Sequence, residues 1–164
     1  MEITFKGQAV ELSGTPPKVG DKAPNFILKD LNDQPHSLEE MQGKPVILSV
    51  IPDIDTRVCA LQTKRFNQEA SQVSDVYFAT ISNNTKEEQA NWCAKEGADM
   101  LMLHDPENKF GESYHLYIPK RDHFARAIFA LDQEGTIRYE EIVSEISHEP
   151  DYEEALKQVR SLLA

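Results

Sequence analysis

The fold is decided by the stretch Val46-Ile47-Leu48-Ser49-Val50-Ile51, which runs directly into the loop Pro52–Arg57. This stretch is rich in β-branched residues and does not alternate between apolar and polar side chains. Such a continuous run is typical of a central strand that is buried on both faces of a sheet. The loop leads into a helix that we expect from Val58 to Ala70. The chain therefore passes from a buried strand through a short loop into a helix.

The elements that follow repeat this alternation. Val76–Ser82 predicts a second strand, and Thr85–Glu88 has the spacing of a capping box, which opens a helix. We expect that helix to end at Gly97. Met100–Leu103 then predicts a short strand and Asn108–Tyr114 a short helix.

The two ends of the chain add further elements. Near the C-terminus, Ala125–Leu131 and Thr136–Val143 flank a turn and predict a hairpin, and Asp151–Leu163 predicts a last helix with an apolar stripe. Near the N-terminus, Ile3–Phe5 and Ala9–Leu12 predict a small hairpin around a glycine. A short strand at Phe26–Leu28 and a short helix between a capping box at Ser37–Glu40 and Gly43 should follow it.

Alternating strands and helices imply parallel pairing, and the hairpin adds antiparallel strands. The order of elements therefore predicts an α/β protein with the thioredoxin fold, in which a mixed central sheet is flanked by helices on both faces. A length of 164 residues suits one domain. We expect a single domain over residues 1–164, with residues 1–17 as an N-terminal β-hairpin extension.

Charge and composition exclude several functions. The formal net charge is -11, which makes nucleic acid and anionic membranes poor partners. No stretch is long and apolar enough to cross a bilayer, and the N-terminus lacks the pattern of a secretion signal. We therefore expect a cytoplasmic protein. A glycine-rich phosphate loop and a dinucleotide fingerprint are both absent, so we expect no cofactor of that kind.

The chain contains only two cysteines, Cys59 and Cys93. In a reducing compartment such a pair is seldom a structural staple. Cys59 falls in the first turn of the expected helix, where unpaired backbone N–H groups and the helix dipole favour the thiolate, the nucleophilic form. Thr56 is suited to cap this helix, and its hydroxyl can face both the sulfur and a bound oxygen atom.

Pro52, Thr56 and Cys59 form the pattern Pro-x-x-x-Thr-x-x-Cys, which resembles the active-site motif of the peroxiredoxins. Four further segments resemble the Tpx-type thiol peroxidases, which are atypical 2-Cys peroxiredoxins. These segments are Leu61–Asn67, Trp92-Cys93, Ala125–Phe129 and Glu149–Tyr152. They occur in order and extend over most of the chain.

The resemblance implies a role for each residue of the motif. Cys59 would be the peroxidatic cysteine, which attacks a hydroperoxide and becomes a sulfenic acid. Thr56 would hydrogen-bond the peroxide, and Pro52 would shield the pocket from water. Arg126 would correspond to the arginine that enters the pocket from a distant strand, where a fixed cation stabilises the thiolate and orients the peroxide.

By the same resemblance, Cys93 would be the resolving cysteine, which forms an intramolecular disulfide with Cys59. Thioredoxin would reduce that disulfide, and the protein would be a homodimer that consumes organic hydroperoxides in preference to hydrogen peroxide. The two cysteines lie on different predicted helices, whereas a disulfide requires Cα atoms about 4.4–6.8 Å apart. We therefore expect both helices to unwind partly in each catalytic cycle.

Simpler interpretations remain open for each residue. Cys93 could only pack beside Trp92, which would leave a one-cysteine peroxidase that depends on an external thiol. Arg126 could be a surface or ion-pair residue, Thr56 only a helix cap, and Pro52 only the end of a strand.

Other classes of function are also open. The same fold could serve as a redox sensor that uses the Cys59–Cys93 pair to change partners, or as a structural domain with inert thiols. The chain has five histidines, but the cysteines lack C-x₂-C spacing and no histidine pair has i, i+4 spacing on a clear helix. We therefore predict no metal site. A thioredoxin-like C-x-x-C motif is also missing.

Overall fold

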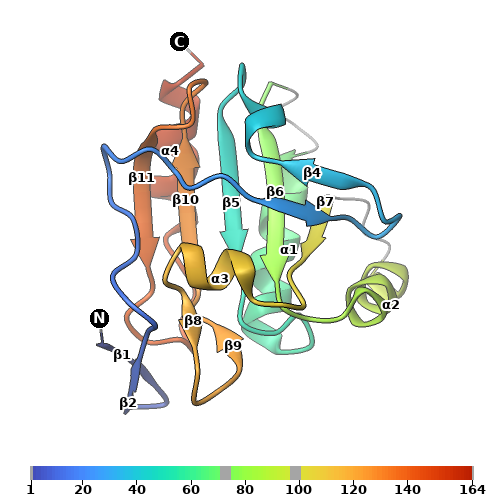
Figure 1. The fold of residues 1–164 in the computed structure, drawn as a ribbon, viewed down its shortest axis with the longest axis vertical. Coiled ribbons are helices and arrows are strands. Elements are labelled where there is room, and N and C mark those ends of the chain that lie inside the picture. Colours follow the sequence, from blue (N-terminus) through green and yellow to red (C-terminus); the bar gives the residue numbers. More distant parts are fainter. Residues whose placement is uncertain (1, 71–74, 97–100, 164) are drawn as a thin grey trace.

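The computed structural model describes residues 2–70, 75–96 and 101–163. Its largest sheet has the strand order β11-β10-β5-β6-β7-β3-β4 (Figure 1). The bounds of these strands are β3 (Ile27–Lys29), β4 (Pro35–Ser37), β5 (Val46–Val50), β6 (Tyr77–Ser82), β7 (Leu101–His104), β10 (Ala127–Leu131) and β11 (Ile137–Ile142). β5, β6 and β7 pair in parallel, and the remaining pairs are antiparallel. The mixed sheet is therefore confirmed.

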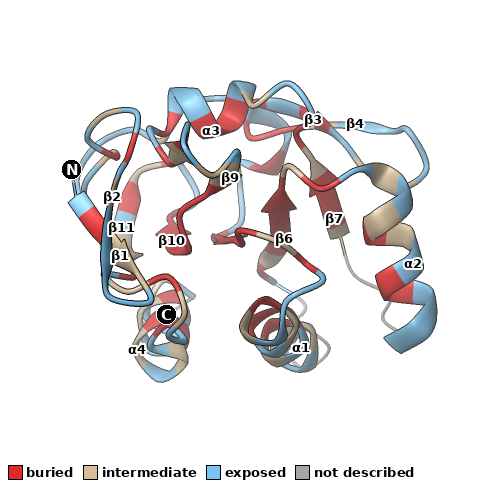
Figure 2. Cartoon of the chain, turned by 90° about the horizontal axis from the view of Figure 1, so that it is seen from below, coloured by how far each residue is buried: buried red, intermediate tan, exposed pale blue. Residues whose placement is uncertain are grey.

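Helices lie on both faces of this sheet. Their bounds are α1 (Arg57–Ala70), α2 (Lys86–Glu96), α3 (Lys109–Ser113) and α4 (Tyr152–Ser161). Figure 2 shows α1 and α4 together on one face, α3 on the opposite face, and α2 beside the β7 end of the sheet. Among the described residues, no helix is both long and apolar enough to cross a membrane.

The predicted burial of β5 on both faces is confirmed, since all five of its residues are buried. Ile47 belongs to a cluster with Phe66 of α1 and Leu156 of α4, whereas Leu48 belongs to the cluster of Phe110 on the other face. Full burial of one such aliphatic side chain stabilises a fold by about 1.5–3 kcal/mol. β5 therefore carries a continuous apolar run because helices cover both faces of the sheet and both sets of its side chains are buried.

The predicted N-terminal hairpin is present as β1 (Glu2–Phe5) and β2 (Gln8–Glu11), which pair with each other. Its turn consists of Lys6–Gly7, both with positive φ, as a tight two-residue hairpin turn requires. Thr4 exchanges two backbone hydrogen bonds of 2.8 Å with the segment 144–146. These bonds attach the hairpin to the C-terminal part of the chain.

The two predicted capping boxes differ in outcome. At α2, the Thr85 amide donates to Glu88 Oε1 at 3.0 Å and the Glu88 amide donates to Thr85 Oγ1 at 3.1 Å, so this box is complete. At Ser37 only half of the box forms, since the Glu40 amide donates to Ser37 Oγ at 3.2 Å, and the expected short helix is a single 3₁₀ turn, Glu39–Met41. The chain leaves the helical conformation at Gln42, which is extended, one residue before Gly43.

Three short strands were not predicted from the sequence: β4, β8 (Tyr117–Ile118) and β9 (His123–Phe124). Two or three residues are too few to show a period, so their pairing depends on what lies beside them. The expected end of a helix at Gly97 and the start of a strand at Met100 lie outside the described residues.

Candidate active site

Cys59 lies where the sequence predicted it, in the first turn of α1 beyond the carboxyl end of β5. The side chain is fully buried. It begins a stripe on the inner face of α1 that continues with Gln62, Thr63 and Phe66, all of them buried. The spacing i, i+3, i+4, i+7 therefore directs Cys59 inward, toward the sheet and away from solvent.

Two donors lie beside the Cys59 sulfur. The backbone amide of Asp53 and Nη1 of Arg126 are each 3.4 Å from Sγ. Arg126 is itself only 2% exposed, so its positive charge acts in a region from which water is largely excluded. Both groups are placed to donate a hydrogen bond to the sulfur, and the guanidinium brings a positive charge beside it.

Arg126 is held in place by two further contacts. Its Nε donates to the Ile146 carbonyl oxygen at 2.9 Å, and Nη1 also donates to Gln62 Oε1 at 3.0 Å. Gln62 in turn donates through Nε2 to Ser49 Oγ on β5 at 2.8 Å. The predicted strand included Arg126, but β10 begins one residue later, and Arg126 lies in the short link after β9.

Gln62 is a site residue to which the sequence analysis gave no role. The sequence did contain a hint of this role. Gln62 is a polar residue on the buried stripe of the helix, and such a side chain needs buried hydrogen-bond partners. The identity of those partners, Ser49 and Arg126, depends on how β5 and the segment before β10 meet α1. Sequence spacing alone does not reveal that arrangement.

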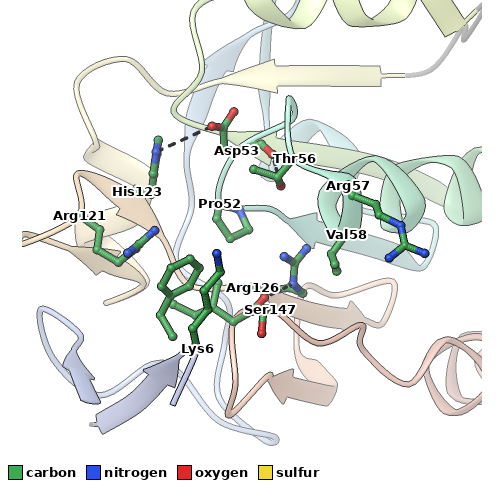
Figure 3. A pocket seen from close by; sticks show the side chains of 12 residues that line it. Lys6, Pro52, Asp53, Thr56, Arg57, Val58, Arg121, His123, Arg126 and Ser147 are labelled. Atoms are coloured by element: carbon green, nitrogen blue, oxygen red, sulfur yellow. Dashed lines mark hydrogen bonds and ion pairs between the residues drawn. The ribbon is translucent and has the colours of Figure 1, made fainter. Parts of the chain in front are cut away.

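The loop between β5 and α1 is braced from a second strand. Asn84, which follows β6, accepts the Ile54 amide at 2.9 Å and donates to Asp53 Oδ1 at 2.9 Å. The other carboxylate oxygen of Asp53 lies 4.0 Å from Nε2 of His123 (Figure 3). Asp53 thus presents its amide to the sulfur while its carboxylate is engaged elsewhere.

The remaining motif residues occupy the same loop. The Thr56 hydroxyl donates to the Asp53 carbonyl oxygen at 2.8 Å, which leaves lone pairs on the hydroxyl oxygen. Pro52 is buried. Desolvation, together with the nearby carboxylates of Asp53 and Glu88, raises the pKa of the Asp55 carboxyl above its ordinary value.

A cavity of about 340 Å³ opens above these residues. Pro52, Thr56 and Arg126, all predicted to form the pocket, line it, and so does Asp53. Further lining residues come from the N-terminal hairpin, the β8–β9 turn and the segment 146–147, and the sequence analysis did not foresee them. The buried Cys59 sulfur therefore lies directly behind a pocket wall that includes both of its hydrogen-bond donors.

Cys93 lies on α2 and is 8% exposed. It belongs to one apolar cluster with Cys59, Trp92 and Met102, and neither cysteine is joined in a disulfide. A second cavity, of about 400 Å³, is lined by the start of α1 and by residues of α2. The two thiols thus share a cluster although they come from different helices.

This arrangement suits nucleophilic chemistry at sulfur, because a buried thiol with an adjacent cation and an adjacent amide is prepared to attack an electrophile. Among the described residues, no group of three or more His, Cys, Asp or Glu side chains could hold a metal ion.

Comparison with known proteins agrees with this chemistry. Residues 19–140 match the AhpC/TSA family. The chain is 43% identical to the thiol peroxidase of Bacillus subtilis (strain 168) over 164 residues, covering 99% of this chain and 98% of that protein. It is 40% identical to the thiol peroxidase of Streptococcus pneumoniae (strain ATCC BAA-255 / R6), covering 98% of this chain and 99% of that protein.

Solved structures share the fold. A peroxiredoxin-like protein from Aquifex aeolicus superposes with a TM-score of 0.92 at 28% identity, covering 98% of this chain and 96% of that one. The thiol peroxidase from Chromobacterium violaceum gives a TM-score of 0.88 at 16% identity, covering 100% and 98%, which supports the fold alone. The thioredoxin-like fold of the peroxiredoxins is thereby confirmed. The chain belongs to the AhpC/TSA family and is a peroxiredoxin-type thiol peroxidase.

Proposed function

We propose that Cys59 is the peroxidatic residue of this peroxidase. The thiolate attacks the terminal oxygen of a hydroperoxide, so that an S–O bond forms and the O–O bond breaks. The leaving alkoxide or hydroxide takes up a proton to give an alcohol or water, and the sulfur is oxidised by two electrons to a sulfenic acid. The observation that carries this proposal is the pair of 3.4 Å contacts from the Asp53 amide and Arg126 Nη1 to Cys59 Sγ.

The pocket residues divide the remaining work. Arg126 holds the thiolate and orients the peroxide with its guanidinium group. Thr56 uses the free lone pairs of its hydroxyl oxygen to accept a hydrogen bond from the peroxide. Pro52, which is buried and lines the pocket, keeps water away from the sulfur. These roles rest on the shared pocket and on the matching family motif.

Cys93 is the resolving cysteine in this proposal. Its thiolate attacks the sulfenic sulfur of Cys59, the S–S bond forms as the S–O bond breaks, and the leaving hydroxide takes up a proton to give water. Support comes from the common apolar cluster and from the cavity between the two helices. We expect the ends of α1 and α2 to unwind partly in this step, because the cysteines lie on different helices and a disulfide needs Cα atoms about 4.4–6.8 Å apart.

The remaining parts of the proposal concern the reductant, the preferred substrate, the cellular location and the oligomeric state. The dithiol of thioredoxin supplies two electrons and two protons to reopen the disulfide. We further propose that organic hydroperoxides are preferred over hydrogen peroxide, that the protein is cytoplasmic, and that residues 1–164 act as one domain within a homodimer. Sedimentation velocity tests the dimer, because a monomer of 18.6 kDa at micromolar concentration would contradict it.

Two serine variants test the roles of the cysteines. Cys59→Ser should abolish hydroperoxide turnover with thioredoxin, its reductase and NADPH, and full activity would overturn the assignment. Cys93→Ser is the matched control. It should still react once with peroxide and accumulate sulfenic acid, detected by mass spectrometry with a trapping reagent.

Trp92 reports the same reaction by fluorescence, because it is the only tryptophan and packs in the cluster of both cysteines. We expect two fluorescence phases in the wild type and one in Cys93→Ser. Continued cycling of Cys93→Ser with thioredoxin would contradict the resolving role.

A further inference from the structure

The mouth of the active-site pocket has an unusual balance of charge for this chain. Acidic residues outnumber basic ones by 28 to 17 in the whole sequence. The pocket lining reverses this ratio, because it contains one carboxylate, that of Asp53, and four Lys or Arg residues. The four are Lys6, Arg57, Arg121 and Arg126.

Arg126 is occupied by the sulfur and by Gln62, whereas Lys6, Arg57 and Arg121 form no ion pair among the described residues, and Lys6 and Arg121 lie close to each other. Both lie over the ring of Phe5, with the Arg121 guanidinium carbon 3.6 Å and the Lys6 ammonium 5.5 Å from its centroid. Figure 3 shows them together at one wall of the pocket.

Glu145, an acidic residue where the hairpin attaches, binds neutral amide and hydroxyl donors and forms no ion pair with either cation among the described residues. Glu145 accepts hydrogen bonds from the amides of Lys6 and Gly7, from the Thr4 hydroxyl, and from the amide and hydroxyl of Ser147. These donors hold the pKa of the Glu145 carboxyl well below its ordinary value. The carboxylate therefore fixes the hairpin backbone and leaves the Lys6 ammonium directed to the pocket.

Apolar side chains form part of the pocket wall, beside polar ones such as Thr56, His123 and Ser147. Phe5, Pro52, Val58 and Ile146 all line the cavity. A volume of about 340 Å³ is at the small end of the range for small-molecule pockets, which is roughly 300–1,000 Å³. The cavity thus combines a partly apolar wall, a reacting sulfur behind that wall and two unpaired cations at its mouth.

We propose that Lys6 and Arg121 form an anion subsite that selects organic hydroperoxides bearing a carboxylate. The inference rests on the proposed peroxidase function of Cys59 and names the substrate class for the same site. The apolar part of the substrate packs against Phe5 and Ile146 while its carboxylate binds the guanidinium and the ammonium. An overall charge of -11 repels anions at long range, so local cations are needed to draw such a substrate in.

The test compares each acid with its own methyl ester, because the two differ in charge but not in the reacting group. We would use 4-(2-hydroperoxypropan-2-yl)benzoic acid and 8-hydroperoxyoctanoic acid, each with its ester. For the wild type we expect kcat/KM of the acid to exceed that of the ester by at least about fivefold at low ionic strength in one pair or both. The ratio should fall toward one in about 0.5 M salt, where the Debye length is only a few ångström.

The variant Lys6→Gln/Arg121→Gln should bring the acid-to-ester ratio close to one. The ratio is taken within one variant, so a general loss of activity cancels. Lys18→Gln/Lys157→Gln is the matched control, since it removes two exposed cations outside the pocket and should keep the wild-type ratio.

Equal turnover of acid and ester by the wild type would overturn the subsite, and so would a preference that survives in Lys6→Gln/Arg121→Gln. Both results would leave the peroxidase role of Cys59 intact. Failure to consume any of the four hydroperoxides, and hydrogen peroxide as well, would instead overturn the proposed function, and the subsite with it.

Discussion

Gln62 is the residue through which the geometry of the site can be tested most sharply. It is fully buried and joins Arg126 to Ser49 of β5 by hydrogen bonds of 3.0 and 2.8 Å. Two substitutions separate its effects. Gln62→Met removes the acceptor that holds Arg126, whereas Gln62→Glu retains an oxygen at that place and adds a negative charge.

The structure gives an order of magnitude for both changes. Arg126 Nη1 lies 3.4 Å from Cys59 Sγ, and two unit charges at that distance attract by about 5 kcal/mol at an effective dielectric constant of about 20. A carboxylate placed beside the same nitrogen should offset at least about 1.4 kcal/mol of this attraction, which corresponds to a tenfold slower reaction with peroxide.

Gln62→Met leaves the positive charge of Arg126 without a neighbouring carboxylate, so it should slow the reaction with peroxide less than Gln62→Glu does. The methionine variant loses one hydrogen bond to a charged group and one between neutral groups, which together stabilise the fold by about 3 kcal/mol. At roughly 2–4 °C for each kcal/mol, Tm should fall by about 6–12 °C.

The assay is stopped-flow fluorescence of Trp92 after mixing with a hydroperoxide at about pH 8, where a carboxyl beside a guanidinium is ionised. Gln34→Glu is the matched control, because it adds the same charge at an exposed position in the β3–β4 turn. We expect the rates to decrease from wild type to Gln62→Met to Gln62→Glu. If Gln62→Glu reacts as fast as Gln62→Met, the charge of Arg126 does not activate the sulfur and the reasoning fails.

Three further predictions concern stability. The Ser147 hydroxyl and then backbone amides hold the pKa of Glu145 below its ordinary value of 4.5, so its stabilising effect is complete above that pH and is lost as the pH falls below it. In urea titrations, the unfolding free-energy difference between wild type and Glu145→Gln should therefore shrink below about pH 4.5, and a constant difference would contradict this. Gly111→Ala should lower Tm, because an added Cβ would lie 2.3 Å from Phe124 Cε1, and such overpacking costs about 1–3 kcal/mol. Tyr114→Phe removes the hydroxyl that donates to the Pro24 carbonyl oxygen at 2.7 Å. Thermal unfolding should show a loss of about 1 kcal/mol in the free energy of unfolding, whereas an unchanged Tm would show that water replaces the hydroxyl.

Local pattern was a good guide wherever an element is long enough to show a period. The run Val46–Ile51 indicated burial on both faces, and the Thr85–Glu88 spacing indicated a capped helix, because each depends on side chains near one another in the chain. The same reasoning overestimated the helix after Ser37, which is one 3₁₀ turn because the backbone is already extended at Gln42. It also missed β8 and β9, whose two-residue strands carry no period.

The same distinction between local pattern and long-range packing applies to the candidate site. The sequence by itself determined that Cys59 lies at the start of a helix behind a buried strand, since strand, loop and helix are contiguous. Only the tertiary structure decided what surrounds the sulfur: Arg126 lies 67 positions away, and Lys6 of the N-terminal hairpin meets Arg121 of the β8–β9 turn. Contacts at that separation depend on how β10, the N-terminal hairpin and the β8–β9 turn pack around α1, and such packing is a property of the whole fold that no local spacing encodes.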